Sequence, residues 1–333
     1  MRKLPKLLRK ALVPLVQLLI TAGILAFVFR EEKQRAEMVA ALRMADVKWL
    51  LRGLLVYGCV ELLASFRWKI LLAIQGLDRG WLHATRLLMI SVFFNLFTPG
   101  LIGGDAVRLF YLTREMPERG ASPAFAAVMM DRIIGLLSLL FLAAVLTLAR
   151  YQWLSQTVMT KRLVEVTLMT LGISFAVFVL TLLLGVSGWI RKLPFSEKLL
   201  SIVETWRRFR HRWKFCLLAF FITLAAHCAF YATFFCAAQA FHATTAGATP
   251  SLGEIFAIMP IVNTLTSVPI SFAGIGVREA LFQTLLGNLV GTPAGVAALM
   301  ASTGFLMRVF WGMTGGVMFL FHPLPRSVLF KKE

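Results

Sequence analysis

The amino-acid sequence predicts an all-α integral membrane protein with about six full transmembrane helices and two oppositely oriented re-entrant hairpins. Three observations predict this fold class. The 333 residues are 59% hydrophobic and 15% charged, with a mean hydropathy of +0.78, which is too apolar for an ordinary soluble domain. Apolar runs long enough to cross a bilayer recur along the chain, and two other runs are broken by proline and glycine. Lysine and arginine are concentrated in particular loops, as in polytopic membrane proteins.

A bilayer crossing needs about 20 apolar residues, and six runs of roughly that length are predicted to be spans. The predicted spans are 11–29, 49–74, 133–148, 164–186, 215–241 and 294–321. The N-terminal sequence MRKLPKLLRK followed by an apolar run resembles a secretory signal. Because no convincing small-residue cleavage site precedes Arg30, we expect a first span that is retained.

Two further apolar runs, 87–97 and 255–270, are too short or too broken to be ordinary spans. The first ends in the sequence TPG, and the second contains two prolines and an asparagine. Each is followed by closely spaced glycines and a second short apolar segment. Irregular backbone is tolerated at membrane depth only where protein or a watery cavity satisfies its amides, so each glycine turn is expected to line one of these.

Positive charge predicts the topology. Loop 187–214 is rich in lysine and arginine and is predicted to be cytoplasmic, whereas loop 242–252 has neither residue and is predicted to be outside. With both termini cytoplasmic in the cytoplasmic (inner) membrane, each broken run must enter and leave on one side, the first from the cytoplasm and the second from outside. Segment 196–213 is either an interfacial amphipathic helix or a solvated basic connector.

The two broken runs resemble each other. The sequence NLFTPGLIGGDAVR at 95–108 and the sequence NTLTSVPISFAGIGVRE at 263–279 both begin Asn-x-x-Thr, pass a proline, reach glycines and then an arginine. Opposite membrane placement is typical of an inverted repeat, here with halves 1–150 and 164–321 in a single membrane domain, 1–333. Because the match is short and gapped, chance similarity is the competing interpretation.

Several charged residues lie in or beside the predicted membrane helices. An arginine or aspartate at mid-depth costs ~2.5–3.5 kcal/mol on insertion scales, so these charges must pair, reach the surface or meet water. The residues are Glu61, Arg67, Asp105, Arg108, Asp131, Arg132, Arg278, Glu279 and Arg308. Asp105 can pair with Arg108 at i,i+3 or cap its helix, and adjacent Asp131 and Arg132 are expected to reach different helices in a structural network.

Arg108 and Arg278 are the predicted substrate-binding residues. Each follows a glycine break that leaves helix amides pointing into the proposed cavity, an arrangement suited to phosphate. The alternative is that each arginine serves only as an internal counter-ion. The remaining predicted binding residues supply hydrogen bonds or close backbone approach; they are Asn95, Thr98, Asn263, Thr266, Gly103, Gly104, Gly274 and Gly276.

Enzyme and cofactor motifs are weak or missing in the sequence. The five histidines and four cysteines show no metal-ligand spacing, and the sequence GIGVRE lacks the third glycine of a dinucleotide site. Neither a persuasive pair of carboxylates nor an ATP-binding motif is visible. The net charge is +19, and the lysines and arginines lie at the ends of apolar runs. This distribution favours the lipid headgroup layer over nucleic acid as the anionic partner. We therefore expect no cofactor, no metal and no nucleic acid.

Three motifs resemble one family: NLFTPGLIGGDAVRLF at 95–110, MMDR at 129–132 and PISFAGIGVREALF at 269–282. They are similar to the lysylphosphatidylglycerol synthase transmembrane-region family, which includes the flippase half of the bacterial multiple peptide resistance factor. The resemblance covers most of the chain and implies a bacterial or archaeal protein that translocates phospholipid. The two-part synthases also carry a soluble aminoacyltransferase domain, whereas this chain ends at HPLPRSVLFKKE, so lipid aminoacylation is not expected.

The resulting functional hypothesis is a lipid flippase or scramblase for an anionic phospholipid or lipid-linked substrate. Arg108 and Arg278 would hold the phosphate, while Asp105 and Glu279 would tune or release it. One alternative is an accessory subunit bound to a lipid-modifying enzyme in a glycolipid, polyprenol-sugar or hopanoid pathway. A second alternative is an integral-membrane transferase with Asp105 or Asp131 as its carboxylate. The transported headgroup, direction, energy source and oligomeric state do not follow from these residues.

Overall fold

The computed structural model describes residues 19–26, 30–98, 103–183, 207–267 and 271–322. These residues form helices joined by turns, and none of them is in a β-strand, which confirms the predicted all-α fold class. Four of the described helices are long and apolar enough to cross a membrane: α3 (Val47–Ile74), α6 (Ala121–Ala149), α11 (Trp213–Ala240) and α14 (Ala294–Phe321). They overlap four predicted spans, although α6 begins at Ala121 rather than at 133, and α8 (Val158–Leu183) covers most of a fifth. The first predicted span lies largely outside the described residues.

The described residues divide between two compact units, each built from three stretches of chain. Unit 1 draws on Met1–Tyr57, Leu139–Ala176 and His227–Arg308. Unit 2 draws on Gly58–Ser138, Val177–Ala226 and Val309–Glu333. Each unit contains one of the two glycine-broken stretches, and the inverted repeat that they suggest stays a prediction.

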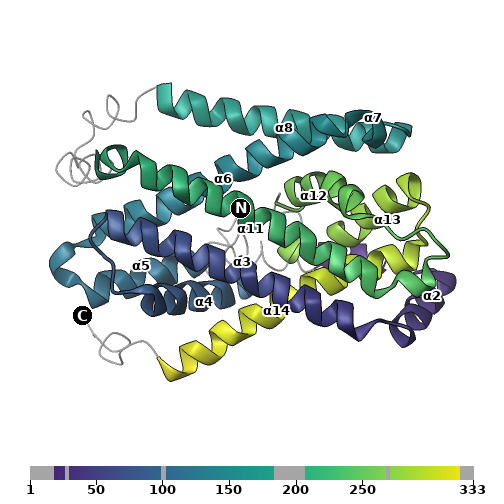
Figure 1. Ribbon diagram of the computed structural model, residues 1–333, viewed down its shortest axis with the longest axis horizontal. Coiled ribbons are helices and arrows are strands. Elements are labelled where there is room, and N and C mark those ends of the chain that lie inside the picture. The colour runs from purple at the N-terminus through teal and green to yellow at the C-terminus, as the bar shows by residue number, and fades with distance from the viewer. Residues whose placement is uncertain (1–18, 27–29, 99–102, 184–206, 268–270, 323–333) are drawn as a thin grey trace, which may run out of the picture. The chain divides into compact units, whose positions relative to one another are not determined.

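The broken stretch of unit 2 forms α4 (Trp81–Phe97) and α5 (Gly103–Glu115), which pack on one another (Figure 1). The short 3₁₀ helix η2 (Pro117–Arg119) then leads into α6. Glycines on the second part of α14 allow close approach to α4, because a Cβ at Gly315 would collide with the carbonyl oxygen of Met89. The unit encloses its own apolar core, whose largest buried side chains include Trp68, Leu71, Leu87, Ile90 and Leu112.

The broken stretch of unit 1 forms α12 (Leu252–Ser267), the 3₁₀ turn η4 (Phe272–Gly274) and α13 (Val277–Leu289). Ser251 and Glu254 begin α12 with reciprocal hydrogen bonds, Glu254 N to Ser251 Oγ at 3.3 Å and Ser251 N to Glu254 Oε2 at 2.7 Å. Pro260 lies inside α12, so the helix continues where the sequence suggested an interruption. Proline removes one helical hydrogen bond, and this helix accommodates it within a buried, well-packed segment.

Smaller elements complete unit 1. They are α2 (Glu32–Arg43), α7 (Tyr151–Leu154) and η3 (His242–Thr244), and α2 contacts η3. The core of this unit includes the fully buried side chains of Tyr231, Phe234, Phe241, Ile258 and Phe282. The re-entrant placement of the two broken stretches and the cytoplasmic location of the termini stay predictions. The proposed amphipathic segment 196–213 lies mostly outside the described residues.

Candidate functional site

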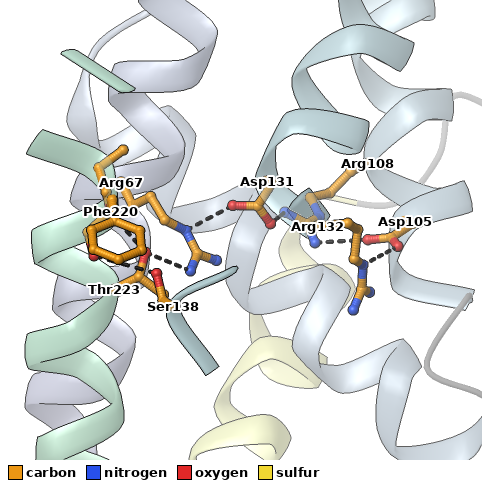
Figure 2. Close-up of polar contacts among 9 residues, drawn as sticks. Arg67, Asp105, Arg108, Asp131, Arg132, Ser138, Phe220 and Thr223 are labelled. Carbon is orange, nitrogen blue, oxygen red and sulfur yellow. Dashed lines mark hydrogen bonds and ion pairs between the residues drawn. The ribbon is translucent and has the colours of Figure 1, made fainter. Parts of the chain in front are cut away.

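Five charged side chains of unit 2, Arg67, Asp105, Arg108, Asp131 and Arg132, form one connected group that we call the charge network (Figure 2). Asp131 Oδ1 on α6 lies 2.8 Å from Arg67 Nε on α3, an ion pair without hydrogen-bond alignment, and Asp131 Oδ2 accepts a 3.1 Å hydrogen bond from Arg108 Nη1 on α5. Asp105 accepts from Arg108 Nη2 at 2.8 Å and from Arg132 Nε at 2.6 Å. Three arginines and two aspartates leave one formal positive charge.

The charge network is buried at its centre and open at one end. The side chains of Arg108 and Asp131 are 4% and 5% exposed, whereas that of Arg132 is 41% exposed. The Arg108 guanidinium lies over the Trp68 ring at 4.6 Å from its centroid, and Arg67 Nη1 donates to Thr223 Oγ1 on α11 at 3.3 Å. Because two carboxylates flank Arg108, its charge is compensated within the protein. A phosphate would have to displace one of these carboxylates.

The polar residues predicted at the first glycine break contact the backbone of their own stretch. Asn95 Oδ1 accepts the Gly104 N–H at 2.9 Å, and Thr98 Oγ1 donates to a carbonyl one turn earlier in α4 at 2.8 Å. A Cβ at Gly103 would collide with Thr98, and one at Gly104 would collide with the Ser91 carbonyl oxygen. Glycine is therefore required for α5 to begin against α4.

Arg278, on the first turn of α13, has a different environment. The residue is 6% exposed, its Nη2 donates to the Ala273 carbonyl at 3.0 Å, and its guanidinium lies 4.4 Å from the Phe305 ring centroid. Among the described residues, Nη1 has no hydrogen-bond partner and the guanidinium has no ion pair. The neighbouring Glu279 is held elsewhere, by the Gly276 N–H at 2.6 Å and the Ser302 hydroxyl at 3.0 Å.

The turn before Arg278 has an unusual backbone. Ala273, Gly274 and Gly276 have φ values of 53°, 74° and 85°, and the left-handed region is strained for an alanine. A Cβ at Gly274 would lie 3.2 Å from Arg278 Nη2 and 3.0 Å from Thr266 Cβ, so this glycine leaves room for both side chains. The turn thereby directs the Ala273 carbonyl at the guanidinium.

The remaining predicted residues of unit 1 lie near this turn or on α14. Thr266 Oγ1 donates to a carbonyl of α12 at 2.7 Å, and Asn263 lies beside the buried Tyr231 hydroxyl. Arg308 is close enough to Arg278 for their charges to repel. In unit 2, Glu61 is buried on α3.

A second ionic cluster in unit 2 surrounds Glu115, the last residue of α5. His83 Nε2 lies 2.5 Å from Glu115 Oε2, and guanidinium nitrogens of Arg86 and Arg79 lie 3.7 and 3.9 Å from the carboxylate. Burial raises the pKa of this carboxyl, but the interaction with His83 and the positive charges of Arg86 and Arg79 lower the pKa by more. The net pKa is below the ordinary 4.5.

Several contacting residues were missed by the sequence reasoning. Trp68 and Thr223 contact the charge network, and Ser302 and Phe305 contact Glu279 and Arg278. Three of the residues on α14 are spaced three apart: Ser302, Phe305 and Arg308. Residues at i and i+3 are neighbours on a helix surface, so this spacing could have predicted their proximity. Within the described residues, no three His, Cys, Asp or Glu side chains are grouped so as to hold a metal ion.

A comparison with known protein families found a match for this chain. The family model described as "Lysylphosphatidylglycerol synthase TM region" matches residues 15–314. The chain belongs to this family. Membership in the lysylphosphatidylglycerol synthase TM-region family confirms the resemblance carried by the glycine-broken motifs, and it agrees with the apolar helices in making this a membrane protein.

Three curated relatives are described as UPF0104 membrane proteins. PH1989 of Pyrococcus horikoshii is 26% identical over 171 residues, which cover 49% of this chain and 47% of the relative. The protein of Methanothermobacter thermautotrophicus is 25% identical over 145 residues, 43% of each chain. MJ1595 of Methanocaldococcus jannaschii is 22% identical over 137 residues, 41% of this chain and 39% of the relative. The chain thus spans less than half the length of each of these relatives of the lysylphosphatidylglycerol synthase TM-region family.

Proposed function

We propose that this protein moves the polar headgroup of an anionic phospholipid or lipid-linked substrate across the cytoplasmic membrane, as a flippase or scramblase, and that Arg278 binds the phosphate. One observation carries the proposal: the buried Nη1 of Arg278 has no hydrogen-bond partner among the described residues. An unsatisfied buried donor costs about 1–3 kcal/mol, and more when the group is charged. A phosphate oxygen would satisfy this donor with the geometry that guanidinium favours.

The local chemistry around Arg278 supports a ligand rather than an internal partner. Phe305 covers the face of the guanidinium, and Ala273 occupies Nη2. Glu279, the nearest carboxylate along the chain, is already held by Gly276 and Ser302, so it can reduce the affinity for an anion without neutralising the arginine. Weak, reversible binding of this kind is what a transport site requires.

Arg108 is assigned a supporting part in this proposal. Its Nη1 and Nη2 donate to Asp131 and Asp105, and only its Nε lacks a hydrogen-bond partner among the described residues, so it connects α5 to α6 at a position where two carboxylates already balance its charge. The two arginines therefore occupy equivalent positions in the two motifs but have different partners: Arg108 contacts two carboxylates, and Arg278 contacts a backbone carbonyl. In unit 2 the glycine break is held together by its own polar side chains, and Arg278 of unit 1 takes the ligand.

The test is transbilayer movement of tail-labelled phosphatidylglycerol and phosphatidylcholine in proteoliposomes. Arg278→Ala is expected to slow phosphatidylglycerol movement by about 10-fold to 100-fold, because a hydrogen bond to a charged group is worth about 1.5–3 kcal/mol. Arg278→Lys keeps the charge and should retain part of the activity. Arg35→Ala, an exposed arginine of α2, is the control that removes one positive charge elsewhere.

Folding of each variant is checked by gel filtration and thermal unfolding in detergent. A folded Arg278→Ala protein that moves lipid at the wild-type rate would remove Arg278 from the mechanism. If the wild type moves none of the tested lipids, the result favours the accessory-subunit alternative. A stoichiometric enzyme partner should then co-purify with the protein. Metal-dependent product formation by the purified chain would instead favour the transferase.

A further inference from the structure

Unit 2 contains a basic cavity that shares no lining residue with the charge network or with the turn before Arg278. It has a volume of ≈ 470 Å³ and is lined by Ile74, Arg207, Arg208, His211 and Arg212. None of the described residues that line it is acidic. Three arginines on a short stretch of chain therefore face one space in which no described carboxylate lines the wall, and an anion is the complementary occupant.

An adjoining cavity of ≈ 340 Å³ shares Ile74 and Arg212 with the first. The other residues that line it are mainly apolar; they are Phe66, Lys69, Ile70, Ala73, Asp78 and Phe215. Phe66 and Phe215 are 48% and 45% exposed although they are large hydrophobic side chains. We call the two cavities together the basic–apolar groove. One end is complementary to an anionic group, and the other end is complementary to hydrocarbon.

The groove lies where two apolar helices end. α3 ends at Ile74 and α11 begins at Trp213, and both helices are long and apolar enough to cross a membrane. Arg208 Nη1 donates to the Gln75 carbonyl at 3.2 Å, which ties the segment before α11 to the residue that follows α3. The ends of transmembrane helices lie at the level of the lipid headgroups. The positive charge of the surrounding loop predicts the cytoplasmic side, where anionic lipids give the surface a negative potential.

We propose that the basic–apolar groove binds an anionic phospholipid of the surrounding leaflet. The lipid phosphate contacts Arg207, Arg208 and Arg212, and an acyl chain lies along Phe66 and Ile70. This lipid would be a bound, non-transported ligand. Its binding is independent of the proposed transport, because the groove shares no residue with the Arg278 turn. A soluble phosphoester offers the same phosphate chemistry but has nothing to place in the apolar half.

The test measures binding rather than transport. Purified protein in a neutral detergent is titrated with phosphatidylglycerol, phosphatidylcholine and glycerol 3-phosphate, and adducts are counted by native mass spectrometry. The double variant Arg207→Gln/Arg212→Gln leaves Arg208 on its carbonyl. The control variant Arg35→Gln/Arg162→Gln removes the same charge from exposed positions of α2 and α8.

Each arginine near an anionic lipid surface contributes about fivefold in affinity, so the double variant should bind phosphatidylglycerol about 25-fold more weakly than the control variant. Phe66→Ala should weaken phosphatidylglycerol binding in the same direction, through the apolar half. Arg207→Gln alone, with about a fivefold loss, replaces the double variant if that protein does not fold.

Three results would overturn the assignment. Equal phosphatidylglycerol affinity in the double and control variants would show that the groove does not hold the phosphate. Glycerol 3-phosphate binding as tightly as phosphatidylglycerol would make the groove a soluble-phosphate site. Phosphatidylcholine binding as tightly as phosphatidylglycerol would show that the arginines do not select charge.

Discussion

Replacing Asp131 by asparagine removes the carboxylate that Arg67 and Arg108 share. Arg67 then keeps only the Thr223 hydroxyl among the contacts described for it, and Arg108 keeps Asp105. Removing one member of a buried ion pair costs about 3–5 kcal/mol, because the remaining charge is left uncompensated. Asp105→Asn is the matched comparison, since Arg108 then keeps Asp131 and the side chain of Arg132 is 41% exposed. That variant should lose only about 1 kcal/mol.

The assay is the free energy of unfolding in mixed micelles, measured by titration with a denaturing detergent for the wild type and both variants. A cycle with Arg67→Gln, Asp131→Asn and the double variant isolates the coupling of the 2.8 Å pair. We expect the double variant to be less destabilised than the sum of the two single variants. Equal losses for Asp131→Asn and Asp105→Asn, or strictly additive losses in the cycle, would refute the argument that burial makes Asp131 the centre of the network.

Three further predictions concern stability and the two glycine breaks. Glu115 has a lowered pKa in the folded state, so its contribution to stability is present above about pH 4.5 and is lost as the pH falls through the folded pKa. Glu115→Gln should therefore reduce the loss of unfolding free energy between pH 4.5 and lower pH, and an unchanged pH dependence would contradict this prediction. Gly104→Ala should destabilise the protein by about 1–3 kcal/mol through collision with Ser91, measured by the same detergent titration. Gly274→Ala, at φ 74°, should cost about 1–2 kcal/mol and slow lipid movement, whereas wild-type movement would separate this turn from the transport site.

The parts of the fold that depend on local sequence were predictable. The length of the apolar runs predicted the four described helices that are long and apolar enough to cross a membrane, and the glycines predicted a break between α4 and α5. The pairing of Asp105 with Arg108 follows from i,i+3 spacing on one helix. Pro260 was misleading, because a helix buried in well-packed surroundings tolerates the loss of one hydrogen bond.

The parts of the site that depend on contacts between distant segments were not predictable. Nothing local to Asp131 indicates that Arg67 lies opposite it, because the two residues are on different helices that meet only in the folded unit. Likewise, the matching motifs suggested matching arginines, but the carboxylates around Arg108 come partly from α6, and the ring over Arg278 comes from α14. One sequence pattern therefore leads to two electrostatic environments.

The charge network also bears on how the chain enters the membrane during synthesis. Arg67 is synthesised well before Asp131, so α3 must first insert without its counter-ion, at a cost of up to ~2.5–3.5 kcal/mol if the arginine reaches the bilayer centre. We expect α3 to remain beside the insertion machinery or at the interface until α6 is made. Nascent chains truncated after α3 should therefore integrate less completely than chains truncated after α6, and equal integration of both would show that α3 does not wait for its partner.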